Sequence, residues 1–171
     1  MRVADLNITE YNSYYQPYIE KSGSGPILEG LRSNAILLAT FVKTIDEEKL
    51  TYRYATGKWT IKEIVLHLID TERVFAYRAL CIARKDKTQF PGFDQDAYVA
   101  NSEANTRTID CLLTEYANVR AATVSLYENF NAGNWLELGT ASHSAVSVRA
   151  IAFIIVGHEN HHLHLIKSRY L

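Results

Sequence analysis

Residues 151–165, IAFIIVGHENHHLHL, place apolar and histidine side chains on one face of a helix. Steps of four, three, four and three residues connect Ile151, Ile155, His158, His162 and Leu165. Side chains with this spacing share one face, so both histidines interrupt the stripe that should face the protein core. Two imidazoles on consecutive turns of a core stripe indicate a common partner, and such a pair can bind one metal ion. The stretch therefore predicts a helix of about 147–169 with a metal site on its buried face.

The same residues spell H-E-x-x-H, the zinc-binding motif of metalloproteases, in His158-Glu159-Asn160-His161-His162. In those enzymes the glutamate is the general base and a third ligand follows further along the chain. The few residues after His162 continue the same helix, so we expect no metalloprotease. Glu159-x-x-His162 also matches part of a di-iron motif, but no second such motif accompanies it, and we expect no di-iron site.

A third histidine, His67, lies in the run Ile64-Val65-Leu66-His67-Leu68-Ile69, at the edge of the apolar side of another helix. Three neutral imidazoles around a divalent ion leave positions open for water or substrate, as catalytic sites require. In the competing interpretation, His67 is half-exposed and forms hydrogen bonds with Asp70 or Thr71. The spacing thus favours a metal site made of His67, His158 and His162.

Four amphipathic stretches of similar length organise the chain, at about 26–44, 60–84, 106–130 and 147–169. Thr60 and Glu63 form a capping box that starts the second helix, and Ser144 or Ser147 can cap the last one. No segment alternates as a strand between hairpin turns. Residues 85–105 lack periodicity, and a loop of this length is more often a functional lid or wall than a linker. Periodicity alone suggests an all-α, antiparallel four-helix bundle.

Composition limits the partners that we expect. A chain of 171 residues fits one domain, residues 1–171, and the net charge of −1 gives no reason to expect nucleic acid or an anionic membrane as partner. The start of the chain lacks an apolar signal segment, which favours a cytoplasmic protein. Cys81 and Cys111 lie in apolar helical runs and are expected to pack unpaired.

Three motifs make the chain resemble the DinB/YfiT-like family of metal-binding proteins. They are Lys58-Trp59-Thr60-Ile61-Lys62-Glu63-Ile64 leading to His67-Leu68-Ile69-Asp70-Thr71-Glu72, the loop Pro91-Gly92-Phe93-Asp94, and Gly157-His158-Glu159-Asn160-His161-His162. The resemblance implies a four-helix bundle in up-down-down-up order, with a long loop between helices 2 and 3. This order differs from the simple antiparallel one, and we adopt it. Family ligands carry over to His67, His158 and His162.

The resemblance also implies chemistry. Family metals include nickel and zinc, and characterised relatives include S-transferases and isomerases that use low-molecular-weight thiols, while others are labelled metal-dependent hydrolases. Relatives often resemble homodimers. We therefore expect a metal-dependent enzyme, a hydrolase or a thiol S-transferase, with one divalent zinc or nickel ion, a small-molecule substrate, possible use of a thiol, and possible homodimerisation. The ion would lower the pKa of bound water or thiol.

No catalytic residue is assigned from sequence. Candidate acid-base groups are Asp70, Glu72, Asp94, Asp96 and Glu159, although each taken singly is expected to be a solvated carboxylate. Candidate pocket walls are Trp59, Phe90, Phe93 and Tyr98, and a candidate partner of an anionic substrate group is Arg149.

Two non-enzymatic alternatives remain open. In the first, the ion is structural or sensory, and a fourth protein ligand, His161 or a carboxylate, closes the site. In the second, the chain is an interaction module whose histidines bind no metal. His164 points away from the main stripe, and nothing in the context of His143 fixes it at the site.

Overall fold

The computed structural model describes all of residues 1–171 and contains four long helices. These are α2 (Ile27–Val42), α4 (Ile61–Ala83), α6 (Ile109–Glu128) and α8 (Val148–Arg169). Each lies within a range predicted from periodicity. The short helices are α1 (Gln16–Lys21), α3 (Glu47–Leu50), α5 (Gln95–Ala100) and α7 (Ala132–Leu136), with single 3₁₀ turns at Val3–Asp5, Ile8–Glu10, Ser13–Tyr15 and Ala104–Thr106. Every helix is either too short or too polar to span a lipid bilayer.

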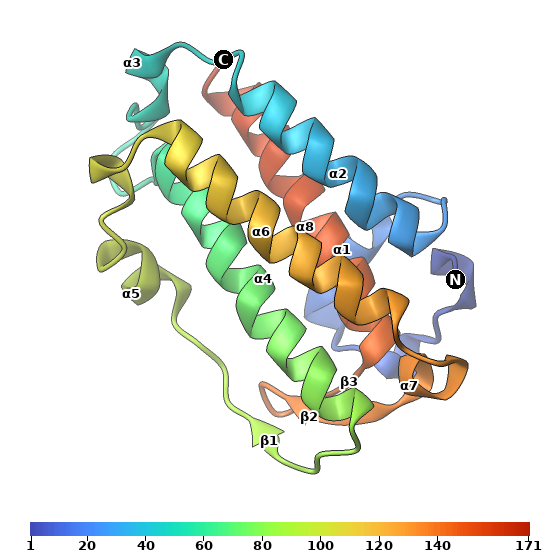
Figure 1. Cartoon of the computed structure of the whole chain (residues 1–171). Helices are drawn as coiled ribbons and strands as arrows, with labels where there is room; N and C mark the ends of the chain where they lie inside the picture. Colours follow the sequence, from blue (N-terminus) through green and yellow to red (C-terminus); the bar gives the residue numbers. More distant parts are fainter.

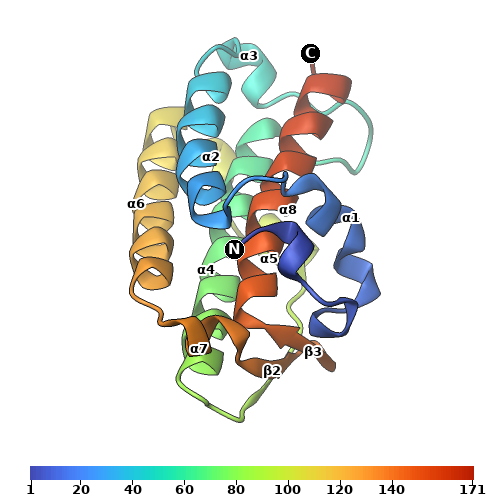
Figure 2. The ribbon, with the colours of Figure 1, turned by 90° about the vertical axis from the view of Figure 1, so that its right-hand side faces the viewer.

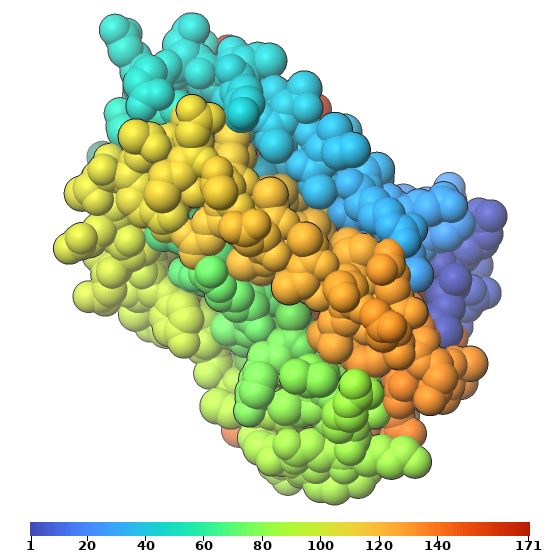
Figure 3. Space-filling view, in the orientation of Figure 1, coloured from blue at the N-terminus to red at the C-terminus, as the bar shows by residue number.

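The long helices form a bundle in which α2 and α8 run one way and α4 and α6 run the other (Figure 1). This confirms the up-down-down-up order. Because α4 and α6 are parallel, the chain between them must return along the bundle, and residues 84–108 do so through β1 and α5. Most residues of α8 are buried, and little of the helix reaches the face seen in Figure 3.

Both predicted helix starts are present. The Thr60 hydroxyl accepts a hydrogen bond from the Glu63 amide at 3.1 Å, and the Glu63 carboxylate accepts one from the Thr60 amide at 2.7 Å. These reciprocal bonds satisfy two amides that the first turn of α4 leaves free. At the start of α8 the cap is Ser147, whose hydroxyl accepts from the Ala150 amide at 3.0 Å.

A polar layer divides the apolar core into two clusters. The first contains residues from 75–83 of α4 and 148–156 of α8, and the second contains residues from 61–69 and 163–170. Between them lie buried His67, Glu72, Arg120, His158 and Glu159. Burial of polar groups is costly unless they are paired, so this layer must have internal partners.

The prediction that no strand forms is wrong. A three-stranded sheet of β1 (Gln89–Phe90), β2 (Leu138–Ala141) and β3 (Ser144–Ser147) closes one end of the bundle, with β1 parallel to β2 and β2 antiparallel to β3. The hairpin turn is made by Ser142 and His143, both with positive φ. Strands of four residues are too short to show alternation, and the turn lacks the glycine that usually marks one.

The short helix α1 lies directly against α8 (Figure 2). Contact is possible because residue 157 is glycine: a Cβ at this position would overlap the carbonyl oxygen of Tyr18. The absence of a side chain therefore allows two backbones to meet at the turn that precedes His158.

Gly157→Ala is expected to displace α1 and to lower the free energy of unfolding by about 1–3 kcal/mol, because overpacking at a backbone contact cannot be relieved by a rotamer change. Chemical denaturation measures the loss, and hydrogen exchange should show reduced protection in Gln16–Lys21. Gly30→Ala is the matched control, since its nearest neighbour, a Val156 methyl, would be 3.6 Å away. The control should be neutral or stabilising within about 1 kcal/mol, as alanine is the better helix former. Equal losses in both variants would contradict the contact.

Candidate metal centre

Helices α4 and α8 bring three histidines together in the polar layer. The Nε2 atom of His158 lies 3.1 Å from Nε2 of His67 and 3.1 Å from Nε2 of His162. These three residues form a group that could hold one metal ion. Their ligand atoms all lie within 4.8 Å of one another. The competing interpretation of His67 as half-exposed is wrong, since its side chain is buried against α8.

Burial keeps all three imidazoles neutral near pH 7. Their exposed fractions are 3% for His67, 9% for His158 and 7% for His162. Burial lowers the pKa of His67 to about 4. Burial first, and then the neighbouring imidazoles, hold the pKa values of His158 and His162 well below the usual range. A neutral imidazole offers a nitrogen lone pair, which is the form that binds a metal.

The donor set fits a divalent ion. The Nδ1 atom of His67 lies 3.4 Å from the Thr71 hydroxyl, so a proton on Nδ1 can be donated there and leave Nε2 free. Three converging nitrogen lone pairs repel one another unless a cation or proton lies between them. Imidazole nitrogen is a suitable ligand for both zinc and nickel.

The metal-free protein should lose stability as the pH falls from about 6.5 to about 4. In the folded state His67 resists protonation down to a pKa of about 4, whereas in the unfolded chain it takes up a proton near pH 6.5. The unfolded state therefore binds more protons in this window, and the loss from His67 alone approaches about 3 kcal/mol. Denaturant unfolding of chelator-treated protein at pH 7, 6 and 5 measures it. If the free energy of unfolding did not change with pH, or if His67→Phe did not reduce that change, the lowered pKa of His67 would be contradicted.

Glu159 belongs to a buried ion-pair network next to the histidines. Arg120 of α6 donates to both Glu72 oxygens, at 2.8 and 2.9 Å, and also to Glu159. The Tyr116 hydroxyl donates to Glu159 at 2.9 Å. Burial raises the pKa of Glu159, although the Arg120 guanidinium opposes the shift. The expectation that Glu72 and Glu159 are solvated is therefore wrong: both are buried, and Arg120 and Tyr116 engage Oε2 of Glu159 while its Oε1 has no partner.

The structure gives most other candidate polar groups structural partners. Asp70 pairs with Arg73 at the surface, and Arg149 pairs with Glu10. Asp94 caps α5, and Asp96 is exposed. These contacts remove Arg149 from the groups free to meet a substrate, while Asp94 still lines a cavity near the triad.

The remaining histidines stay outside the cluster. His161 is half-buried, with its ring 5.4 Å from that of Tyr18, and His164 is exposed. His143 lies in the exposed hairpin turn. No fourth histidine or carboxylate joins the three, so the cluster is open rather than closed. Cys81 and Cys111 are both free.

Aromatic side chains surround the triad. Trp59 lies 4.7 Å from His67 and stacks at 6.4 Å on His162, measured between ring centroids. On the other side Tyr18 meets His158 edge to face at 5.3 Å. Of the predicted walls, Trp59 and Phe93 line cavities near the triad. Phe90 packs in the core, and Tyr98 touches Phe93 from outside.

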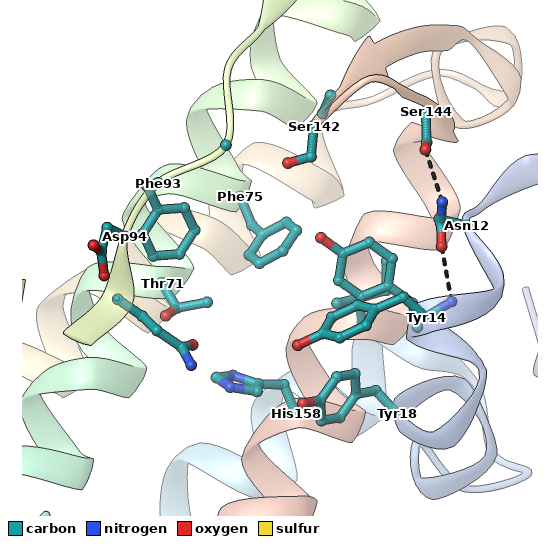
Figure 4. A pocket seen from close by; sticks show the side chains of 15 residues that line it. Asn12, Tyr14, Tyr18, Thr71, Phe75, Phe93, Asp94, Ser142, Ser144 and His158 are labelled. Atoms are coloured by element: carbon teal, nitrogen blue, oxygen red, sulfur yellow. Dashed lines mark hydrogen bonds between the residues drawn. The ribbon is translucent and has the colours of Figure 1, made fainter. Parts of the chain in front are cut away.

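A cavity of about 470 Å³ opens onto His158 (Figure 4). Tyr14, Tyr18 and Asn12 lie on one side of it, and Phe93 and Asp94 lie on the other. A smaller hollow of about 230 Å³ reaches His162, between Trp59, Lys58 and Tyr170. Two openings therefore reach the triad, one at His158 and one at His162, and different parts of the chain line them.

Sequence reasoning missed Arg120 and the tyrosines of the N-terminal segment. Arg120 could have been found, because it continues the buried stripe of α6 with Tyr116, Thr123 and Tyr127 in steps of four, three and four. The N-terminal tyrosines carry no periodic signal, since they lie in short turns whose position depends on contact with α8.

Comparison with known proteins adds a family match and one similar sequence. The model of the DinB superfamily matches residues 31–166. A protein from Oceanobacillus iheyensis, provisionally named a metal-dependent hydrolase, is 25% identical over 132 residues, which cover 76% of this chain and 75% of that protein.

Two solved structures share the fold. YfiT from Bacillus subtilis, provisionally described as a metal-dependent hydrolase with an unusual four-helix bundle topology, aligns with a TM-score of 0.70 at 15% identity over 96% of this chain and 90% of YfiT. The mycothiol-dependent maleylpyruvate isomerase aligns with a TM-score of 0.68 at 11% identity over 99% of this chain, which spans 64% of that enzyme. At such identities the likeness extends to the fold alone.

Proposed function

The chain belongs to the DinB superfamily, and from this premise we propose that it is a metal-dependent enzyme whose divalent ion is held by His67, His158 and His162. The observation that carries the proposal is the open cluster itself: three buried, neutral imidazoles converge, and one of them, His158, lines a cavity large enough for a small molecule. A structural ion would usually have a fourth protein ligand, and none joins the cluster.

A divalent ion held in this way supplies Lewis acidity, which lowers the pKa of a water or thiol that it binds. The protein's own side chains prepare the site. The Thr71 hydroxyl can accept a proton from Nδ1 of His67, which favours the tautomer with Nε2 free. Trp59 and Tyr18 shield opposite sides of the triad and leave the cavity at His158 as the main approach. Arg120 of α6 donates to Glu159 and so links α8 to α6.

Two reactions are compatible with the site: hydrolysis of a small molecule, and transfer to or from a low-molecular-weight thiol. The relatives named above include a protein called a metal-dependent hydrolase and an isomerase that depends on the thiol mycothiol. The second hollow at His162 favours thiol chemistry, because a reaction with two organic ligands needs two places to bind them, whereas water needs none.

Zinc- and nickel-loaded protein should be assayed with a panel of cellular thiols and electrophiles, and in parallel with small esters and amides. We expect thiol-dependent turnover that a chelator abolishes and added metal restores. Hydrolysis without any thiol dependence would favour the hydrolase. Stoichiometric metal with neither activity, and with no change in the spectrum of a cobalt-loaded sample on addition of thiol, would overturn the enzyme proposal in favour of a structural or sensory ion.

A further inference from the structure

A small cavity of about 10 Å³ lies between His158 and the buried ion pairs. His158 and Thr71 line both this cavity and the larger one that opens onto His158. Glu72, Glu159 and Arg120 give the small cavity its other polar walls, and two aliphatic side chains complete the lining. A cavity of this size, with several polar groups around it, has room for one water molecule and for no larger ligand.

One carboxylate oxygen of Glu159 receives no hydrogen bond from the protein. Arg120 and the Tyr116 hydroxyl both donate to Oε2, whereas Oε1 accepts nothing although Glu159 is only 1% exposed. A buried carboxylate oxygen without a donor is costly, so native proteins pair such atoms with a protein group or with an ordered water. Because Glu159 lines the small cavity, a water molecule there is a donor that Oε1 can reach.

His158 also requires a partner, at its Nδ1 atom. The contacts of its ring nitrogens within the protein are made by Nε2, which meets His67 and His162, so Nε2 is the atom that would bind the ion. The proton of the neutral ring then lies on Nδ1, and a metal-bound imidazole is oriented by the acceptor that this N–H meets. For His67 the acceptor is the Thr71 hydroxyl. For His158 no protein group takes this place.

We propose that one water molecule occupies the small cavity, accepts a hydrogen bond from Nδ1–H of His158 and donates one to Oε1 of Glu159. Its second hydrogen can be donated to Thr71 or Glu72, so the water has the roughly two to four polar partners of a buried site. Glu159 is then a positioning residue, which orients the metal ligand His158 through the water and touches neither ion nor substrate. The positioning role rests on the proposed function, whereas the water site does not.

Two substitutions of Glu159 separate the water contact from the charge. Glu159→Gln and Glu159→Leu both remove the charge and leave Arg120 paired with Glu72, but only glutamine keeps a polar group that can hold the water. Zinc affinity, measured by competition with a chromophoric chelator, should be about tenfold lower in Glu159→Leu than in Glu159→Gln. Tyr116→Phe is the control. It removes a donor to Oε2 but lies outside the cavity lining, so it should leave zinc affinity nearly unchanged.

Two further measurements detect the water and its effect on the imidazole. A high-resolution crystal structure of the metal-free natural protein should show an ordered water within hydrogen-bond distance of Oε1 of Glu159. In zinc-loaded protein labelled with ¹⁵N-histidine, the Nδ1 proton of His158 should give a resolved NMR signal, and Glu159→Leu should lose that signal through exchange with solvent.

Two outcomes would overturn the inference and leave the metal site intact. One is a crystal structure without a water in the small cavity, and the other is equal zinc affinity of Glu159→Gln and Glu159→Leu. If the natural protein bound no zinc, the proposed function would be wrong, and the positioning role of Glu159 with it. The metal-free crystal structure therefore separates failure of the water site from failure of the metal site.

Discussion

Arg120→Met is expected to destabilise the protein by about 3–5 kcal/mol, because it leaves the buried carboxylates of Glu72 and Glu159 without their cation. Arg120 is 2% exposed, and its guanidinium donates to both carboxylates and to the Leu31 carbonyl at 2.9 Å. Methionine fills similar space without a donor, so the loss reports uncompensated charge rather than a cavity. Denaturant unfolding at pH 7 measures it.

The pH dependence gives this prediction a second signature. Burial already raises the pKa of Glu159, and without the guanidinium that opposes the shift it should rise further. A carboxyl whose folded-state pKa is raised costs stability as the pH rises above about 4.3, the unfolded value. The deficit of Arg120→Met should therefore be small near pH 4 and grow toward neutrality.

The matched control removes the charges together. Arg120→Met combined with Glu72→Gln and Glu159→Gln should recover much of the lost stability, because a neutral layer needs no cation. If the single variant lost less than about 1 kcal/mol, the network would be hydrated rather than buried, and the two-cluster description of the core would be wrong.

His158→Ala is expected to weaken divalent-metal binding about a thousandfold, which corresponds to about 4 kcal/mol. His158 lies 3.1 Å from each of the other imidazoles, so its loss leaves only two nitrogens, from different helices, around the ion. Competition with a chromophoric chelator measures the affinity. His67→Ala and His162→Ala should show losses of similar size.

Two further histidines serve as controls for this prediction. His164→Ala should leave the affinity unchanged because the side chain is exposed. His161→Ala should lower it far less than His158→Ala does, because the His161 ring packs on Tyr18 and on the His162 ring without joining the cluster. A loss in His161→Ala as large as that in His158→Ala would indicate a fourth ligand and a closed site. The structural or sensory alternative would then be the better account.

The sequence predicted those parts of the fold that repeat over many residues. The four long helices follow apolar stripes, and their starts follow side-chain caps, so both were accessible without coordinates. The order of the helices came from family resemblance, because stripes fix which face is buried and not which way a helix runs. The β2–β3 hairpin was missed because four-residue strands and a turn of Ser142 and His143 carry almost no local signal.

The candidate site was only partly accessible. Spacing selected His158 and His162, and position within an apolar run selected His67; the structure brings the three together, while metal binding by them stays a prediction. The burial of Glu72 and Glu159 was misjudged because their partner, Arg120, is 48 and 39 residues away along the chain. The place of α1 against α8 could not be foreseen, because it depends on a backbone contact that only the glycine at position 157 allows.

The most direct test of the metal site is a nickel titration of untagged Trp135→Phe protein, followed by the fluorescence of Trp59. Trp59 and Trp135 are the tryptophans of the chain, and Trp59 lies 4.7 Å from His67, where a bound nickel ion should quench it. We predict quenching that saturates at one nickel per chain and is reversed by a chelator. Absence of saturable quenching, or the same quenching after His67, His158 and His162 are all replaced by alanine, would contradict a metal ion at this site.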